Sequence, residues 1–461
     1  MKLKTKAIMR VCAFLLAASL LAGCGGGGDS ASGSSDGKSS SAKSSKATSS
    51  ASASGAGDTS SDAVSDGSSS DSASNDGTSS VQHSSSAAAS SKADSGNKSS
   101  MSVLPNYTRD SMKEFGHNGN TKSQYPVYAG KRDPWLWPFA RDSIWNTPIG
   151  SNAVYKAAGL EKAPKYSCDY EHLLTTTTND DYVALYDTPK GHRWPTDVSG
   201  LKVRARFYFP KGYTVSKSST DNNCSAILQP DGRYYNELEP TCRDDANAMY
   251  VTGYNRLNQD IYGEGRLGSH WGSGLSTLGG SIRVGELLNS EPIHHALKIN
   301  VYAKKYIYYD IAYQKGYRWP ADRHDAYARN VYGGTDPELR MGSLLALPKD
   351  STPESIGIKT EVGKKLFYAL RDYGCYIVDD SAQDCYSIDA DIQTMKELKR
   401  ETGINLNMVV SMSDTTIQRN FTKDFMALIT NLMIITNNDS KNIGGGGTPR
   451  APLAPDLPSV K

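Results

Sequence analysis

The chain has 461 residues, and 51 Lys and Arg residues against 49 Asp and Glu residues leave a formal net charge of +2. This balance predicts no nucleic-acid partner, because proteins that bind nucleic acid carry a basic stripe or patch. Apart from the N-terminal leader described next, no apolar run approaches the length of a membrane-spanning helix.

The first residues resemble the signal peptide of a bacterial lipoprotein. A basic start precedes a short apolar run at residues 11–21, well under the ~20 residues that span a bilayer. The run ends in Leu21-Ala22-Gly23-Cys24, which resembles a lipobox. The resemblance implies that residues 1–23 are removed and that a lipid on Cys24 anchors the chain to the extracytoplasmic face of the cell membrane. An ordinary secretory signal is the alternative.

The composition of residues 24–100 predicts a disordered tether. Of the 76 residues from 25 to 100, 31 are Ser, and the only large apolar ones are Val64 and Val81. Such a segment cannot bury enough apolar surface to offset the entropy lost on ordering. As a flexible coil it would reach roughly 50 Å, enough to hold a folded domain away from the membrane.

Residues 125–437 predict a single extracytoplasmic domain, which we expect to be monomeric. In residues 201–209 polar and apolar side chains alternate, which predicts a strand. Residues 225–228 and 233–238 predict two strands on either side of the turn sequence Pro230-Asp231-Gly232. Further strands are expected over residues 279–287, 343–347, 375–378 and 433–436, and a pair of short β runs is expected over residues 296–310.

Helices are fewer. Residues 363–373 place Leu366, Phe367 and Leu370 on one face, with Gly374 at the position of a C-terminal cap, and residues 391–402 and 415–431 are also helical in pattern. The chain is therefore expected to be mainly β, a β-sandwich or jelly-roll-like domain with a few peripheral helices. A doubly wound α/β sheet fits less well, because strands and helices do not alternate regularly. The Gly- and Pro-rich residues 438–461 predict a disordered tail.

Five cysteines follow the lipobox. In an oxidising compartment we expect two local disulfides, Cys224–Cys242 and Cys375–Cys385, with Cys168 buried. A zinc site is the alternative for these residues, but no C-x-x-C spacing occurs. We therefore predict no metal and no cofactor.

The pattern R-W-P-x-D occurs twice, at residues 193–197 and 318–322. Trp194 and Trp319 offer flat faces on which a sugar ring can stack, while charged neighbours hydrogen-bond its hydroxyls. The second copy crowds Asp322, Arg323 and His324 into one turn, which favours a site. The alternative is two structural corners in which Trp fills a core and Arg pairs with Asp.

Three further groups are candidates for a site. His270 and Trp271 lie in a glycine-rich loop that permits close approach of the backbone, and they could line a groove; a plain loop is the alternative. Glu286 and the His294-His295 pair lie in or next to expected strands. Glu286 is either a structural carboxylate or a catalytic one.

These residue types suit glycan chemistry, since glycoside hydrolysis needs paired carboxylates and β-elimination needs His, Tyr and Arg. We expect the catalytic groups to be Glu286, His295, His324 and Asp322. We expect the substrate-binding groups to be Trp194, Trp319, Arg323, Trp271 and His270.

A resemblance supports the choice of residues. The segments FARDSIWNTPIG (139–150), GSHWGSGLSTLGGSIRVGEL (268–287), HHALKINVYAKKYIYYD (294–310) and YRWPADRHDAYA (317–328) resemble a family of secreted, mostly uncharacterised proteins of actinobacteria, over roughly residues 131–437. A fainter likeness to a broader set of bacterial extracellular proteins picks out Glu286, His295, Trp319, Arg323, His324 and Asp379. Neither likeness implies an activity.

Together these patterns predict a lipid-anchored protein of the cell surface that acts on a polysaccharide or cell-wall glycan, as a glycoside hydrolase or a polysaccharide lyase. A non-catalytic glycan- or wall-binding lipoprotein is the alternative, since it needs the same aromatic residues without the titratable ones. A third hypothesis is the solute-binding protein of a transporter. The lipobox agrees with this hypothesis, but the β-rich pattern does not.

Overall fold

A computed structural model describes residues 127–128, 131–187, 199–216, 222–243, 249–407 and 415–459. Predictions for the signal peptide, the lipid on Cys24, the Ser-rich tether and Trp194 fall outside these residues. Across the ranges that are described, no helix is long and apolar enough to cross a membrane.

Many elements lie where the sequence pattern predicts them, but the strands that begin at Lys165, Asp181, Met249 and Cys385 were not predicted. The strands are β1 (Val127–Tyr128), β2 (Lys131–Arg132), β3 (Tyr155–Ala157), β4 (Lys165–Thr175), β5 (Asp181–Asp187), β6 (Val203–Phe209), β7 (Ser225–Leu228), β8 (Tyr234–Arg243), β9 (Met249–Asp260), β10 (Leu297–Val301), β11 (Leu344–Ala346), β12 (Cys375–Asp380), β13 (Cys385–Asp391) and β14 (Met433–Ile435). The helices are α2 (Ala303–Tyr306), α3 (Ala328–Val331), α4 (Glu361–Asp372), α5 (Ile392–Thr402), α6 (Thr416–Thr430) and the 3₁₀ turn η1 (Ile443–Gly445).

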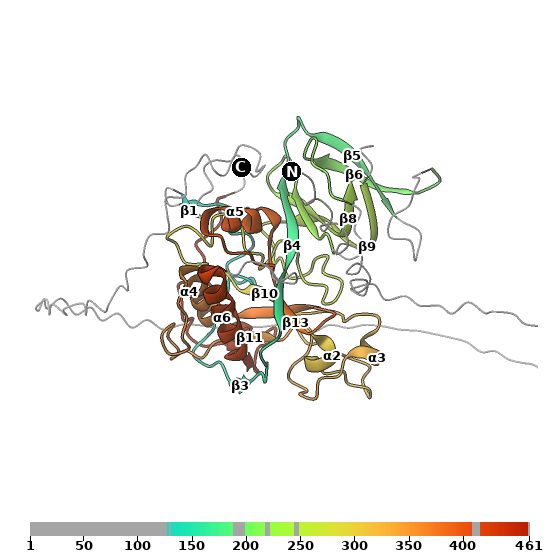
Figure 1. The fold of residues 1–461 in the computed structure, drawn as a ribbon. Coiled ribbons are helices and arrows are strands. Elements are labelled where there is room, and N and C mark those ends of the chain that lie inside the picture. The colour runs from blue at the N-terminus through green and yellow to red at the C-terminus, as the bar shows by residue number, and fades with distance from the viewer. Residues whose placement is uncertain are drawn as a thin grey trace, which may run out of the picture. The chain divides into compact units, whose positions relative to one another are not determined.

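The long strand β4 joins two groups of strands. Twelve strands are hydrogen-bonded in the order β3-β14-β11-β12-β10-β13-β4-β7-β8-β9-β5-β6, while β1 and β2 pair separately. The first part of β4, to Glu171, pairs in parallel with β13, and its last part, from His172, pairs in parallel with β7. Figure 1 shows β4 running from the group that holds β5 and β6 to the group that holds β10 and β11.

The prediction of a mainly β fold is confirmed. The strand order does not show the jelly-roll-like sandwich that we expected, because a jelly roll is antiparallel throughout. Here β10 pairs in parallel with β12, β4 with β13 and β7, and β5 with β9. These parallel contacts join strands that are far apart in the sequence, a pairing that no local pattern specifies.

The expected hairpin around Pro230 is confirmed. Ser225 of β7 pairs with Leu238 of β8, and Gly232 takes the positive φ of 71° that the turn requires. The Asp231 carboxylate accepts hydrogen bonds from the backbone N–H groups of Arg233 at 2.8 Å and Tyr234 at 2.9 Å. This side chain therefore fixes the turn, and with it the register of the two strands.

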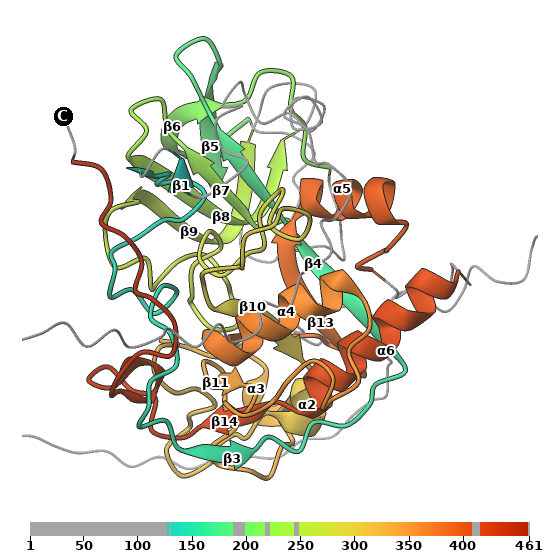
Figure 2. The same ribbon diagram turned by 90° about the vertical axis from the view of Figure 1, so that its left-hand side faces the viewer.

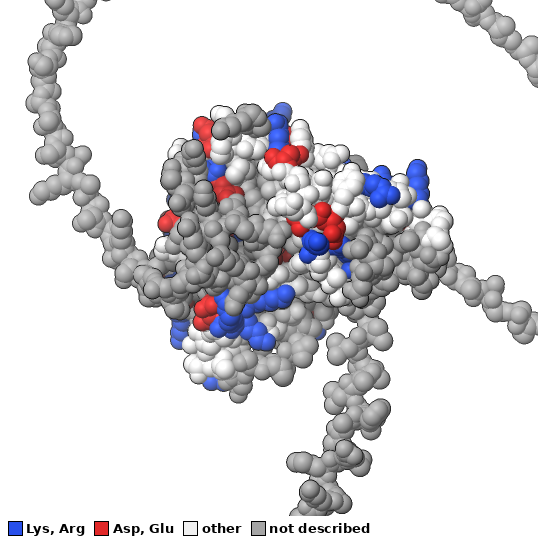
Figure 3. All heavy atoms as spheres, turned by 90° about the horizontal axis from the view of Figure 1, so that it is seen from above, with Lys and Arg blue, Asp and Glu red and all other residues white. Residues whose placement is uncertain are grey.

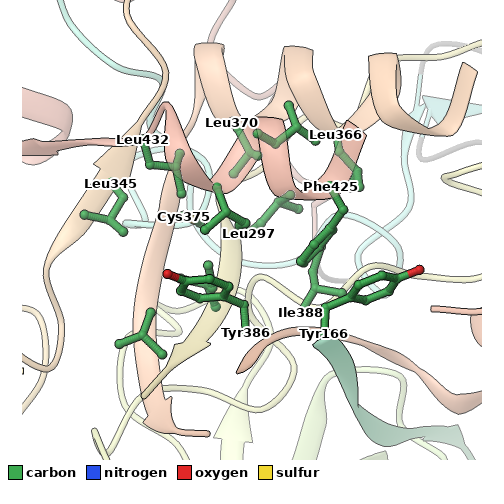
Figure 4. Packing of buried hydrophobic residues seen from close by; sticks show 14 of the residues in the cluster. Tyr166, Leu297, Leu345, Leu366, Leu370, Cys375, Tyr386, Ile388, Phe425 and Leu432 are labelled. Atoms are coloured by element: carbon green, nitrogen blue, oxygen red, sulfur yellow. The ribbon is translucent and has the colours of Figure 1, made fainter. Parts of the chain in front are cut away.

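Helix α4 forms where the apolar spacing and Gly374 predict a helix, and it packs with α6 over the sheet. The Thr360 hydroxyl accepts a hydrogen bond from Gly363 N at 3.0 Å, and Gly374 follows the helix with a φ of 78°. Figure 2 shows α4 and α6 lying across one side of the strands. Figure 4 shows side chains from the helices, such as Leu366 and Phe425, meeting Leu297 and other strand residues in the largest apolar core.

Two expected strands are absent from the described residues. Residues 303–306 form helix α2 in place of a second β run, and residues 279–287 make turns with one isolated bridge, from Ile282 to Ala390. Within 279–287, Gly280 and Gly285 have φ values of 76° and 88°, which an extended strand does not have. The apolar residues of 279–287 are still buried. The alternation of polar and apolar residues in this segment therefore indicates burial and not pairing in a sheet.

The predicted disulfides are wrong. No disulfide joins the cysteines of the described residues, and Cys168, Cys224, Cys242, Cys375 and Cys385 are all buried thiols. Cys375 lies on β12 and Cys385 on β13, and β10 runs between these strands. Two strand spacings amount to roughly 9.5 Å, beyond the reach of a disulfide. Cys224 instead faces His270, with 3.9 Å between Sγ and Nδ1.

The prediction of a disordered tail is also wrong for residues 438–459. Pro449 forms a bridge with Gly150, Ala454 is buried, and Arg450 donates a hydrogen bond to the carbonyl of Arg371 at 2.6 Å. A Cβ atom on Gly150 would lie 1.9 Å from the carbonyl oxygen of Gly446. The glycines here therefore allow close packing of two backbones, where the sequence pattern indicated a flexible linker.

The aromatic contact between α6 and β4 should carry a large share of the stability. Phe425 is 2% exposed, and its ring centroid lies 4.6 Å from that of Tyr166. We expect Phe425→Ala to lower the free energy of unfolding by about 3–5 kcal/mol, because it leaves a cavity in the core. Ile417→Ala, on the same helix at a side chain 39% exposed, is the control and should change it by about 0.5 kcal/mol or less. Equal effects in urea denaturation would contradict this packing.

Candidate functional site

The strands under the largest core have two chemically different faces. Ile299 of β10 pairs with Ile388 of β13, which pairs with Cys168 of β4, and all three belong to the apolar core. Side chains alternate along a strand, so the residues next to these three point to the opposite face. Those neighbours are polar or charged: Lys298, Asn300, Asp389, Ser387, Asp169 and Ser167.

A lysine lies at the centre of this polar face. Lys298 Nζ donates hydrogen bonds to Glu171 Oε1 at 2.5 Å and to the carbonyl of Thr277 at 2.7 Å, and lies 3.0 Å from His270 Nε2. His270 Nε2 is also 2.9 Å from Glu171 Oε1. The side chains of Lys298, Glu171 and His270 are 0% exposed. The expectation that His270 lines a groove is therefore wrong, because it belongs to a buried polar network.

We use the name acidic cluster for the carboxylates around this network, namely Asp169, Glu171, Glu239, Asp379 and Asp389. Burial raises the pKa of Glu171 to about 8, and it raises the pKa of Asp389 well above the usual range. Burial, with the charge of Lys298, lowers the pKa of His270 well below its usual range. At neutral pH the ring of His270 is therefore uncharged.

Two members of the acidic cluster share one amide. Asn222 Nδ2 donates hydrogen bonds to Asp169 Oδ2 at 3.0 Å and to Asp379 Oδ2 at 3.2 Å. Asn300 Nδ2 also donates to Asp169 Oδ2, at 3.0 Å. Asp169 and Asn222 are partly exposed, whereas Asp379 is 7% exposed. Burial raises the pKa of Asp379 well above the usual range, and the charges of Asp325, Glu239 and Asp169 add to this effect.

The glycine-rich loop and the second R-W-P-x-D motif meet beside these carboxylates. Asp322 N donates to the carbonyl of Ser273 at 3.0 Å. A Cβ atom on Gly274 would lie 2.0 Å from Asp322 Oδ1, and one on Gly272 would lie 2.4 Å from Asp379 Oδ1. The close approach that these glycines permit is therefore an approach to the protein's own carboxylates.

Predicted substrate-binding residues occupy the rim of this arrangement. Arg323 forms a two-point ion pair with Asp322, at 2.6 Å and 3.0 Å, and both side chains are partly exposed. Trp271 is 36% exposed, and its backbone N–H donates to Glu239 Oε2 at 2.7 Å. Trp319 is instead partly buried against the second apolar core. Trp271, Asp322 and Arg323 are thus the predicted residues that the structure brings together near the surface.

His324 lies in an aromatic surrounding next to a second acidic pair. Its ring is 5.4 Å from the ring of Tyr309, and Nδ1 lies 2.9 Å from the carbonyl oxygen of Asp325. The Tyr332 hydroxyl donates to Asp325 Oδ2 at 2.6 Å, and the Tyr327 hydroxyl donates to Asp380 at 3.2 Å. Burial, with repulsion from Asp380, raises the pKa of Asp325 to about 6.

Glu286 and His295 form a separate pair. His295 Nε2 lies 3.2 Å from both carboxylate oxygens of Glu286, one of which also accepts from Arg283 N at 2.7 Å. Burial raises the pKa of Glu286, but the charge and hydrogen bond of His295, with the charge of Arg283, reverse this and lower it overall. Across the described ranges no hydrogen bond or ion pair joins this pair to Asp322 or His324, so the single catalytic group that we expected is not shown.

Two sets of side chains have the donor atoms of a metal site. One is Cys224, Glu239 and His270; the other is Glu171, His270 and Asp389. In each set the donor atoms lie within 4.8 Å of one another, and all these side chains are buried. In the second set the ammonium group of Lys298 already lies among the donors.

Surface charge adds no further candidate on the face that Figure 3 shows, where acidic and basic side chains are interspersed. No family model, no curated protein and no solved structure matches this chain. The likeness to secreted actinobacterial proteins therefore stays a prediction.

Stability should depend on pH through Asp325. Its pKa is raised from 3.8 to about 6 on folding, so the stabilising contribution of the protonated group is complete below pH 3.8 and is lost as the pH rises through 6. The variant Asp325→Asn can still accept the hydrogen bond from the Tyr332 hydroxyl, but it has no carboxyl group at this position and so does not lose this stability as the pH rises. Relative to the wild type, the variant should gain about 3 kcal/mol between pH 3 and pH 8. Urea denaturation at several pH values measures the difference, and parallel pH curves would contradict the assignment.

Proposed function

We propose that this chain is a lipid-anchored, carbohydrate-active enzyme of the bacterial cell surface, and that it is a glycoside hydrolase. The observation that carries the proposal is the pair Asp169 and Asp379, whose carboxylates accept hydrogen bonds from the same amide of Asn222. Glycoside hydrolysis needs two carboxyl groups on either side of one glycosidic bond. The lipobox at Cys24 and the Ser-rich tether support the location.

The two carboxyl groups have surroundings that suit different roles. Asp379 is nearly buried among other acidic groups, which raises the pKa of its carboxyl group and so favours the protonated form that a general acid requires. Asp169 is more exposed than Asp379. Burial raises the pKa of Asp169 as well, but the hydrogen bonds that it accepts from Asn222 and Asn300, and the charge of Lys298, oppose this rise. We assign Asp379 as the proton donor to the leaving oxygen and Asp169 as the base or nucleophile.

The neighbouring surface supplies contacts for a sugar. The exposed ring of Trp271 offers an apolar face for stacking, and the Arg323–Asp322 pair offers donors and acceptors for hydroxyl groups. Backbone contacts hold Trp271 to Glu239 and Asp322 to Ser273, so these groups keep fixed positions relative to the carboxylates. This replaces Glu286 and His295, which we had expected to be catalytic, by Asp379 and Asp169.

A polysaccharide lyase is the less favoured form of the same proposal, because the paired groups here are carboxyls, whereas a lyase needs His, Tyr and Arg around a uronic acid. The alternative function is a non-catalytic glycan- or wall-binding lipoprotein. It would use Trp271 and Arg323 in the same way but would not require Asp379.

Replacement of Asp379 separates these functions. We expect Asp379→Asn, assayed on full-length protein with peptidoglycan and a panel of neutral and acidic polysaccharides, to lose about 10²–10⁴-fold in turnover. Binding should persist, because the amide keeps the shape of the carboxyl group. New reducing ends measure hydrolysis, and unsaturated products would reveal elimination.

Asp384→Asn is the matched control, since Asp384 is exposed and lies immediately before β13. It should leave turnover unchanged, and so should Glu286→Gln if the protein stays folded. Retention of turnover in Asp379→Asn would reject the assignment. Wild-type binding without any product from the panel would favour the non-catalytic lipoprotein.

A further inference from the structure

We propose that Cys224, Glu239 and His270 bind a divalent transition-metal ion, and that Zn²⁺ fits this ligand set best. A thiolate, an imidazole and a carboxylate are the three kinds of side chain that zinc takes as ligands. Their donor atoms lie within 4.8 Å of one another, and Cys224 and His270 are 0% exposed. The inference goes beyond the proposed hydrolase activity and does not depend on it.

The fold holds these three side chains together from three directions. Cys224 immediately precedes β7, and the register that pairs Ser225 with Leu238 places Glu239 beside it on β8. His270 comes from the glycine-rich loop, and its Nδ1 lies 3.9 Å from the Cys224 sulfur. The site is therefore assembled by pairing of β7 and β8 and by docking of one loop.

The loop that carries His270 is fixed on both sides of the histidine. Ser269 N donates to Glu237 Oε2 at 2.9 Å, and Trp271 N donates to Glu239 Oε2 at 2.7 Å. The other nitrogen of the ring, Nε2, lies 2.9 Å from Glu171 Oε1. A carboxylate on the far nitrogen of a histidine is the usual partner of a metal-binding imidazole, because it orients the ring and directs the free nitrogen at the metal.

An independent observation indicates that positive charge is missing here. Both oxygens of Asp389 and Oε2 of Glu171 are buried without a hydrogen-bond partner in the described part of the chain. Asp389 Oδ2 is 3.5 Å from His270 Nε2 and 3.7 Å from Lys298 Nζ. One ammonium group thus faces the carboxylates of both Glu171 and Asp389, an arrangement that is costly in a low-dielectric interior. A divalent cation on the other side of His270 would balance this charge.

The second set of donors, Glu171, His270 and Asp389, is the weaker choice. Lys298 Nζ lies 2.5 Å from Glu171 Oε1 and 3.0 Å from His270 Nε2, so it occupies the space and repels a cation. The set with Cys224 faces the opposite nitrogen of the same ring. Three protein ligands leave one position of a tetrahedral ion for water or another small ligand.

Cobalt substitution tests the site directly. Full-length protein, purified without chelators, should contain about one zinc ion per chain by mass spectrometry. After removal of the metal, titration with Co²⁺ should give one equivalent of binding with a thiolate-to-cobalt charge-transfer band and the visible bands of a tetrahedral ion. Cys224→Ser should abolish the charge-transfer band, and Cys385→Ser, at another buried thiol, should leave it unchanged.

Glu239→Gln keeps the size of the side chain and guards against a variant that fails to fold. It should weaken Co²⁺ binding by at least about tenfold while the thiolate band remains at saturation. The proposal is overturned if the wild type takes up no stoichiometric Zn²⁺ or Co²⁺. It is also overturned if the band survives in folded Cys224→Ser or disappears in folded Cys385→Ser.

Discussion

The contact on which the arrangement of the site depends is the buried pair formed by Lys298 and Glu171. Lys298 belongs to β10 and Glu171 to β4, and β13 lies between these strands. The same ammonium group is fully buried. It donates hydrogen bonds to the carbonyls of Ser276 and Thr277, which connects the glycine-rich segment to the sheet. One cation thus holds two distant strands and the loop that carries His270 and Trp271.

Such a centre does not stabilise the fold by itself. Removing charged groups from water costs several kcal/mol for each ion, and the attraction between them returns only part of this. The stabilisation comes from the other face of the same strands, where Ile299, Ile388 and Cys168 pack under α4 and α6. The two faces of the sheet therefore have different roles. One face stabilises the fold by burying apolar side chains, and this stabilisation offsets the desolvation cost of the polar network on the other face.

The sequence specified local structure well and the site poorly. Signals such as Asp231 and Gly374 act within a few residues, so the hairpin and helix α4 could be predicted from pattern alone, although the N-cap Thr360 was not recognised. The sequence also holds an alternation of Lys298, Asp169 and Asp389 with apolar residues, although the strands that carry the two aspartates were not predicted. Its meaning depends on parallel pairing of β4 with β13, more than 200 residues away, which no local signal provides.

The errors have the same physical origin. The cysteines suggested local loops, but strand order separates Cys375 from Cys385, and His270 faces Cys224. His270 and Trp271 are neighbours in one loop, yet one is fully buried and the other is exposed, because the loop turns between the sheet and the surface. Composition gave no means of telling them apart.

The C-terminal segment has a mechanical consequence if the domain is held at its N-terminal side, as in the proposed lipid anchoring. Arg132, near the start of the described domain, donates a hydrogen bond to the carbonyl of Pro455, and Arg141 pairs with Asp456. The first and last parts of the domain are therefore fastened to each other. A force applied at the N-terminal side would act on these contacts with the C-terminal segment before it acts on the strands. The C-terminal segment thus reinforces the part of the domain where the chain enters it.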